Sequence, residues 1–168
     1  MFGVSLRYPG ILSASEPGGG TTDWAVHIFK QAVLYGKYQG CFLSADTALP
    51  MMYMPDCLKA TIELMDAPED LHWRSRVYNV TSMSLAPRHL EEEIRKFIPD
   101  FEIVYAPPGD FRQAIANSWP RSIDDQLARE DWGWKADFGV EAMTRDMLKL
   151  WKNRLAKAGK NTVALQNV

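Results

Sequence analysis

Cysteine and histidine are scarce in this sequence, and their scarcity argues against several chemistries. The 168 residues include two cysteines, Cys41 and Cys57, and three histidines, and neither type is spaced like the ligands of a metal site. We interpret the cysteines as buried free thiols in a reducing compartment. The scattered histidines give no basis for a Ser-His-Asp triad. The sequence therefore predicts no metal site.

An excess of positive charge is also lacking. The net charge is −2 and the isoelectric point is near 5.9, which gives no electrostatic reason to expect a nucleic acid or an anionic membrane as a partner. No apolar run approaches the ~18 residues of a membrane-spanning helix. The first residues do not have the composition of a signal or transit peptide.

Two motifs of nucleotide-dependent dehydrogenases are absent. No G-x-G-x-x-G turn follows the first predicted strand, because the glycines from Gly18 to Gly20 lack that spacing. None of the six tyrosines has a lysine four residues later, so no Tyr-x-x-x-Lys acid–base pair is present. From the residues alone we expect a ligand-approach loop on a scaffold, and no catalytic residue within this chain.

The hydrophobic periodicity predicts strands that alternate with helices, which is typical of an α/β protein. At 46% hydrophobic residues, the chain can bury a core as one domain or as a piece of a larger one. We treat residues 1–160 as a single domain and 161–168 as a frayed tail. The predicted strands are 4–8, 41–43, 51–54, 76–80 and 101–105, and the predicted helices begin at Trp24, Pro55, Pro87, Asp110 and near Met143.

The segment from Pro17 to Trp24 is the most distinctive local feature. Three glycines run into a helix start that Thr21, Thr22 or Asp23 can cap. The N–H groups and the positive dipole end of such a helix favour an anionic group, for example a carboxylate or a phosphate. The alternative interpretation is a flexible connector followed by an ordinary N-cap.

A long, ordered series of segments resembles the L-threonine 3-dehydrogenases of the short-chain dehydrogenase type, which belong to the extended, epimerase-like branch. Together these segments cover the chain to about residue 150. They are residues 6–11 (LRYPGI), 17–23 (PGGGTTD), 49–57 (LPMMYMPDC), 78–81 (YNVT), 110–116 (DFRQAIA), 118–120 (SWP), 122–125 (SIDD), 128–129 (AR), 131–134 (DWGW) and 142–144 (AMT).

The resemblance implies NAD-dependent oxidation of L-threonine at its β-carbon to 2-amino-3-oxobutyrate, in threonine catabolism to glycine. It also implies an NAD(P)-binding Rossmann-like fold with a small substrate-binding domain, and pairing of the full-length protein as a homodimer. By the same resemblance Tyr8, Pro9, Gly10 and Ile11 are expected to bind the cofactor. Thr21, Thr22 and Trp119 are expected to bind L-threonine, with Trp119 closing over it.

The sequence departs from this family at its start, because its first residue corresponds to a position about halfway along the members of the family. We interpret the chain as the C-terminal portion, without the dinucleotide turn and the catalytic tyrosine, and expect it to be inactive alone. One alternative is a non-catalytic remnant or partner-binding subunit that pairs through an exposed sheet edge. Another is a relative of the nucleotide-sugar epimerases and dehydratases. The resemblance implies a mitochondrial location in a eukaryote, which we favour, and a cytoplasmic one in a bacterium.

Overall fold

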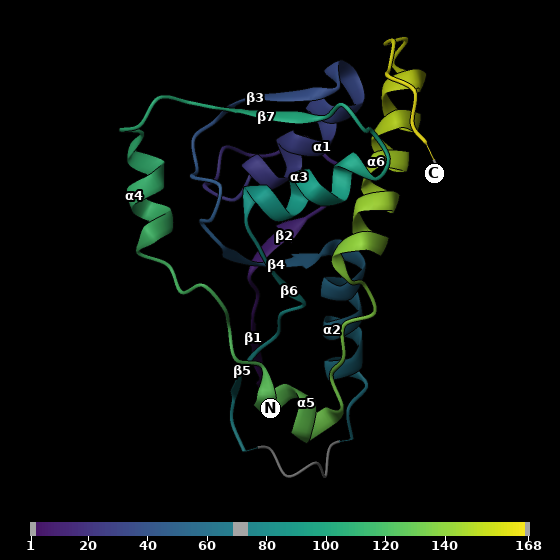
Figure 1. Ribbon diagram of the computed structural model, residues 1–168. Helices are drawn as coiled ribbons and strands as arrows, with labels where there is room; N and C mark the ends of the chain where they lie inside the picture. Colours follow the sequence, from purple (N-terminus) through teal and green to yellow (C-terminus); the bar gives the residue numbers. More distant parts are fainter. Residues whose placement is uncertain (1–2, 69–73, 167–168) are drawn as a thin grey trace.

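A computed structural model describes residues 3–68 and 74–166 of the chain, and strands and helices alternate along it as the sequence predicts (Figure 1). The elements are β1 (Ser5–Arg7), β2 (Gly10–Leu12), α1 (Trp24–Tyr35), β3 (Lys37–Cys41), β4 (Leu49–Tyr53), α2 (Met54–Met65), β5 (Val77–Asn79), β6 (Met83–Leu85), α3 (Pro87–Arg95), β7 (Glu102–Tyr105), α4 (Phe111–Asn117), α5 (Gln126–Trp132) and α6 (Val140–Lys157).

The strands of the described residues form three small sheets (Figure 1). β1 pairs with β5 and β3 pairs with β7, both in parallel, while β4 lies between a parallel β2 and an antiparallel β6. Pro9 separates β1 from β2, because proline removes a ladder donor and favours a break at that point. The chain thus passes directly from the first sheet into the second.

The larger core surrounds α1. Its apolar positions at helical spacing, among them Trp24, Ile28 and Phe29, are fully buried. The helix packs against α3, α6 and β3. It ends at Gly36, where φ is +70° and the N–H group donates to the carbonyl of Ala32, which is typical of a glycine that ends a helix.

A second, smaller core lies between α2, α5 and the β1–β5 pair, with Met52, Tyr78 and Trp134 at its centre. In α2 the residues Leu58, Ile62 and Met65 lie at helical spacing, yet their exposed fractions are 56%, 57% and 79%. The opposite face of α2 is the buried one. The predicted helix is confirmed, while its apolar stripe faces outward.

Three local predictions need correction. The third strand begins at Lys37, directly after the helix, and not at Cys41. β6 is absent from the predicted strands, because three residues between two breaks carry almost no periodic signal. The tail is not frayed over residues 161–166: the N–H groups of Val163 and Gln166 donate to the carbonyls of Val33 and Phe97, which fixes an irregular segment against α1 and α3. Residues 167–168 lie outside the described part.

No helix in the described residues is both long enough and apolar enough to cross a membrane.

Candidate functional site

The glycine loop before α1 is closed on itself. The Asp23 carboxylate accepts hydrogen bonds from the N–H groups of Gly19 and Gly20, at 2.5 and 2.6 Å. Gly19 has a φ of +105°, a value that side chains other than glycine rarely adopt. The N–H groups of the helix start also have partners, since Ala25 and Val26 donate to the carbonyls of Thr22 and Asp23. The chain's own carboxylate thus takes the N–H groups of Gly19 and Gly20, and an anion site at this helix start stays a prediction.

Gly10 and Thr22, from two separate predicted segments, are in direct contact. A Cβ atom at Gly10 would lie 2.8 Å from Cγ2 of Thr22 and 2.6 Å from Sδ of Met51. Only a residue without a side chain leaves room for both. The contact places the threonine pair beside the first residue of β2, directly after the carboxyl end of β1. In open α/β sheets the carboxyl ends of strands are where ligands bind.

The predicted cofactor residues Tyr8, Pro9, Gly10 and Ile11 lie consecutively across the junction of β1 and β2, and all are partly buried. The hydroxyl of Tyr8 shares a hydrogen bond of 2.6 Å with the hydroxyl of Thr61 on α2. Tyr8 and Ile11 also pack against the smaller core. The Tyr8 hydroxyl therefore holds α2 against the strand junction.

Thr21 and Thr22 lie in the turn that precedes α1 and are partly buried. The Thr22 carbonyl caps the helix by accepting from the N–H group of Ala25 at 3.1 Å. Neither threonine hydroxyl hydrogen-bonds to any residue that the structure describes. Both hydroxyls are therefore available to a ligand.

Trp119 follows α4, the helix at the left edge of Figure 1, and its side chain is 40% exposed. The helix is held to the body, because its Ala116 is buried in the larger core. No hydrogen bond or ring contact within the described residues joins it to Thr21 or Thr22. The structure thus brings Gly10 and Thr22 together but does not bring Trp119 to them.

Polar contacts hold α4 to the loop that follows β3. The amide of Gln113 accepts from the N–H group of Ser44 at 2.6 Å and donates to the hydroxyl of Thr47 at 3.0 Å. At the helix start Asp110 accepts from the N–H group of Arg112, which makes it the N-cap of α4. The hydrogen bonds from Arg112 lower the pKa of the partly buried Asp110 carboxyl. These polar contacts add to the packing of Ala116, which is 2% exposed and belongs to the same core as α1.

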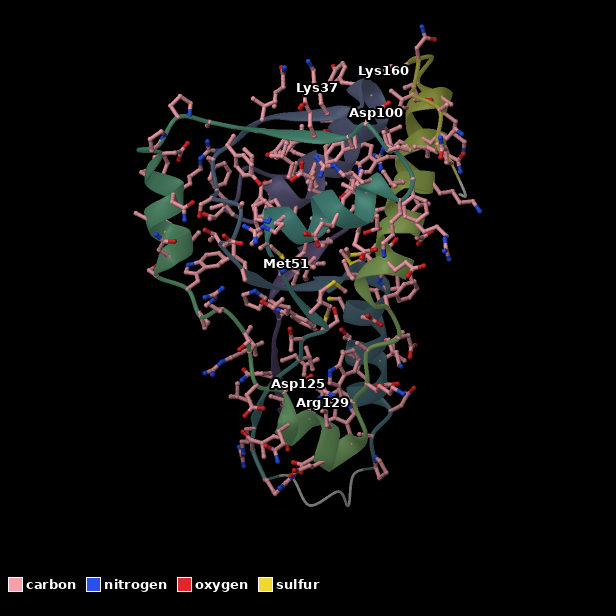
Figure 2. All side chains as sticks on the ribbon, viewed as in Figure 1. Lys37, Met51, Asp100, Asp125, Arg129 and Lys160 are labelled. Carbon is pink, nitrogen blue, oxygen red and sulfur yellow. The ribbon has the colours of Figure 1, made fainter. Side chains whose placement is uncertain are left out.

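The segments 122–125 and 131–134 form a structural network around α5 (Figure 2). The Asp125 carboxylate accepts from Arg129 at 2.7 Å and from the indole N–H of Trp134 at 3.1 Å. Asp131 accepts from the hydroxyl of Tyr78 on β5 at 2.5 Å. These carboxylates satisfy buried donors and tie α5 to the β1–β5 pair, which accounts for them without a ligand.

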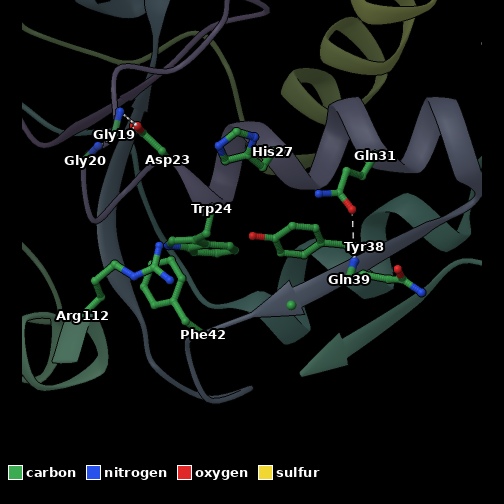
Figure 3. Close-up of a pocket in the computed structure, with 11 residues that line it drawn as sticks. Gly19, Gly20, Asp23, Trp24, His27, Gln31, Tyr38, Gln39, Phe42 and Arg112 are labelled. Atoms are coloured by element: carbon green, nitrogen blue, oxygen red, sulfur yellow. Dashed lines mark hydrogen bonds between the residues drawn. The ribbon is translucent and has the colours of Figure 1, made fainter. Parts of the chain in front are cut away.

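A pocket that the sequence did not predict lies between the glycine loop, α1 and β3 (Figure 3). Its volume is about 250 Å³, and its walls include Trp24, His27, Tyr38 and Phe42. The hydrophobic spacing of α1 places Trp24 on the buried face of that helix. The hydrophobic pattern does not predict the first part of β3, which carries Tyr38. Among the described residues no group of three or more His, Cys, Asp and Glu side chains is placed to hold a metal ion.

The fold is of the α/β class, and the chain is similar in sequence to proteins described as epimerases or dehydratases. An uncharacterized epimerase/dehydratase of Staphylococcus saprophyticus is 43% identical over 88% of this chain and 47% of its own length. No protein-family model matches the chain. The predicted Rossmann-like α/β class is confirmed by the structural neighbours described next.

Within that class the similarity is to L-threonine 3-dehydrogenases. The mitochondrial enzyme of Bos taurus is 49% identical over 91% of this chain and 41% of its own length. The crystal structure of L-threonine dehydrogenase from Phytophthora infestans superposes with a TM-score of 0.85, at 52% identity, over 90% of this chain and 48% of that one. The chain thus spans about half the length of the relatives it matches, and the predicted resemblance is confirmed.

Proposed function

We propose that this chain is the substrate-binding part of an NAD-dependent L-threonine 3-dehydrogenase. The observation that carries the proposal is the contact between Gly10 and Thr22, which joins two segments of the resemblance at a strand end where ligands bind. The similarity to L-threonine dehydrogenases over nine tenths of the chain supports the same conclusion. The reaction converts L-threonine and NAD⁺ to 2-amino-3-oxobutyrate, NADH and a proton.

In this proposal the threonine pair orients the substrate. The hydroxyls of Thr21 and Thr22 hydrogen-bond to the polar groups of L-threonine, and they are available because no described residue engages them. Trp119 covers the substrate from α4.

The residues at the β1–β2 junction fit one part of an NAD site. Pro9 and Ile11 are only partly buried there and give an apolar surface suited to a flat ring, while the Cβ side of Gly10 between them is filled by Met51 and Thr22. NAD, when bound, supplies the hydride acceptor. The phosphate-binding turn and the Tyr-x-x-x-Lys pair are not among the motifs of this sequence, so the full cofactor site and the acid–base step require residues beyond these.

The proposal is tested by joining this chain to the part of the Cupriavidus necator L-threonine dehydrogenase that it does not span. We expect the 168-residue chain alone to produce no NADH with L-threonine, and the joined protein to produce it. Steady NADH formation by the chain alone would contradict the assignment of the acid–base step to residues beyond this chain. A correctly folded joined protein without activity on L-threonine would contradict the assignment of the substrate.

A second candidate function is the binding of another polypeptide. In the described part of the chain β1 has a strand neighbour only in β5, although parallel sheets are normally larger and covered on both faces. Leu58, Ile62 and Met65 add an apolar helix face with no cover. These features support assembly with a dehydrogenase partner, including a second copy in a homodimer. Size-exclusion chromatography of the chain alone tests it, because a strict monomer that recruits no partner would argue against it.

An alternative proposal concerns the substrate. The similarity to an uncharacterized epimerase/dehydratase supports activity on a nucleotide-sugar as a competing proposal, which the same joined protein tests with a nucleotide-sugar substrate.

The relatives from Bos taurus and Sus scrofa are named as mitochondrial. We propose a mitochondrial location if the source is a eukaryote and a cytoplasmic one if it is a bacterium.

A further inference from the structure

The hydrogen bond between Tyr8 and Thr61 has a definite direction. Inside α2 the hydroxyl of Thr61 donates to the carbonyl oxygen of Cys57 at 2.9 Å, because a carbonyl can only accept. A threonine hydroxyl carries one proton, and this bond uses it. The Tyr8 hydroxyl, 2.6 Å from Oγ1 of Thr61, is therefore the donor of the second bond. The three groups form a relay in which Tyr8 donates to Thr61 and Thr61 donates to the helix backbone.

This relay acts at a break between two sheets. The paired residues of β1 and β5 end at Arg7, and those of β2 and β4 begin at Gly10. Tyr8 and Pro9 lie between the two ladders, and Pro9 has no N–H group to donate. The side-chain bond from Tyr8 to α2 therefore fixes the chain at a point where sheet pairing is interrupted.

The helix that receives the bond is itself held in place. Thr61 lies at helical spacing from Cys57 and Ala60, which are 8% and 0% exposed and form part of the buried side of α2. This side packs against the smaller core, and the helix contacts β2 and β4. At its start α2 follows β4 without a loop, since β4 ends at Tyr53 and α2 begins at Met54. The relay thus ties the strand junction to an element that core packing already fixes.

We propose that Thr61 is a positioning residue for the strand junction from Tyr8 to Gly10, and that it sets the affinity of this junction for NAD. The inference rests on the proposed function, which places the cofactor at the junction. Thr61 acts through Tyr8 and not by contact with the cofactor: it accepts the hydrogen bond that keeps Tyr8 and Pro9 in one place at the end of β1. Without its hydroxyl the junction occupies more than one position, and NAD must then select the competent one, which weakens binding.

Removal of the Thr61 hydroxyl in the joined protein described above is the main test. Thr61→Val keeps a branched side chain of similar size. Calorimetry without L-threonine should show NAD binding weakened about three- to tenfold, the range expected for loss of one neutral hydrogen bond. At saturating NAD, kcat should change less than about twofold, because the relay does not touch the reacting groups. Thr61→Ser restores the hydroxyl and should restore the affinity for NAD.

Two further variants keep the test specific to the relay. Thr144→Val on α6 is the matched control, because Thr144 is 0% exposed and its hydroxyl has no partner among the described residues. It should leave the affinity for NAD unchanged. Tyr8→Phe removes the donor at the other end, so it should weaken NAD binding as much as Thr61→Val does. The double variant should then bind no more weakly than either single variant, and additive effects would overturn the relay.

A measurement on the 168-residue chain without cofactor separates this inference from the proposed function. With tyrosine labelled at the ring carbon Cζ, the NMR signal of Tyr8 should shift in Thr61→Val and return in Thr61→Ser. An unchanged Tyr8 signal would overturn the relay, and a shifted signal with unchanged affinity for NAD would overturn the positioning role. If the signal shifts but the unsubstituted joined protein binds no NAD, the proposed function and the role of the junction in NAD binding are both contradicted, while the relay stands.

Discussion

Gly10 and Thr22 lie so close that a single methyl group cannot be placed between them. A Cβ atom at Gly10 would be 2.8 Å from Cγ2 of Thr22, and the Sδ atom of Met51 closes the other side at 2.6 Å. Gly10 is the first residue of β2 and Thr22 lies in the turn before α1. The contact therefore fixes the distance between the strand junction and the threonine pair.

Substitution of Gly10 tests this contact. We expect Gly10→Ala to lower the free energy of unfolding by about 1–3 kcal/mol, because the new methyl group must displace Thr22 and Met51 in a packed region. Urea denaturation measures the change. Gly3→Ala is the control, since no atom lies within 4 Å of a Cβ at that position. Adding Thr22→Ser, which removes Cγ2, should recover part of the lost stability. A Gly10→Ala variant as stable as the wild type would contradict this prediction, because it would show that Thr22 and Met51 can move aside without cost.

The hydroxyl of Thr22 should contribute to substrate binding in the joined enzyme described above. We expect Thr22→Val to lower kcat/KM for L-threonine about tenfold or more, because hydrogen bonds to charged groups contribute about 1.5–3 kcal/mol. Steady-state kinetics measure it. Thr162→Val in the tail is the matched control, and it should leave kcat/KM unchanged. Equal effects of the two substitutions would remove Thr22 from the proposed site.

The carboxylate of Asp131 should make stability depend on pH. Burial by itself raises the pKa of Asp131, but hydrogen bonds from Tyr78 and Arg74 outweigh burial and lower it. A carboxyl whose pKa is lower in the folded state stabilises the fold above its unfolded pKa of about 3.9, and this contribution is lost as the pH falls through the folded pKa.

The wild-type chain should therefore be more stable than Asp131→Asn at pH 7, and the difference should shrink below about pH 4. Urea denaturation at a series of pH values measures both proteins. Tyr78→Phe, which deletes one of the two donors, should reduce the pH-dependent difference without abolishing it. A stability difference that stays constant from pH 7 to pH 3 would contradict this account.

The exposed face of α2 should matter for assembly and not for stability. We expect Ile62→Lys to change the free energy of unfolding by less than about 0.5 kcal/mol, because the side chain is 57% exposed. It should weaken association with a dehydrogenase partner, because a charge would then be buried in an apolar interface. Analytical ultracentrifugation measures association, and Leu150→Lys on α6, where the side chain is 42% exposed, is the control.

Much of the local structure follows from short-range rules that the sequence displays. The apolar spacing from Trp24 to Val33 and the stop at Gly36 locate α1, and Pro55, Pro87 and Asp110 lie at or near the starts of three further helices. The strand before Pro9 was likewise predictable. β6 and the first part of β3 were not, since strands this short depend on partners far away in the sequence.

The site divides in the same way. The amino-acid order alone identifies the residues with unusual backbone or side-chain chemistry: the glycines of the loop, the two threonines and the Pro-Gly junction. Tertiary structure decided how these groups are used, because hydrogen-bond partners and neighbours in space depend on how the chain folds back on itself. The folded chain places the N–H groups of Gly19 and Gly20 on Asp23, packs Thr22 against Gly10 and leaves Trp119 40% exposed. It also brings Tyr38 and Trp24 together in the wall of a pocket that the hydrophobic periodicity does not predict.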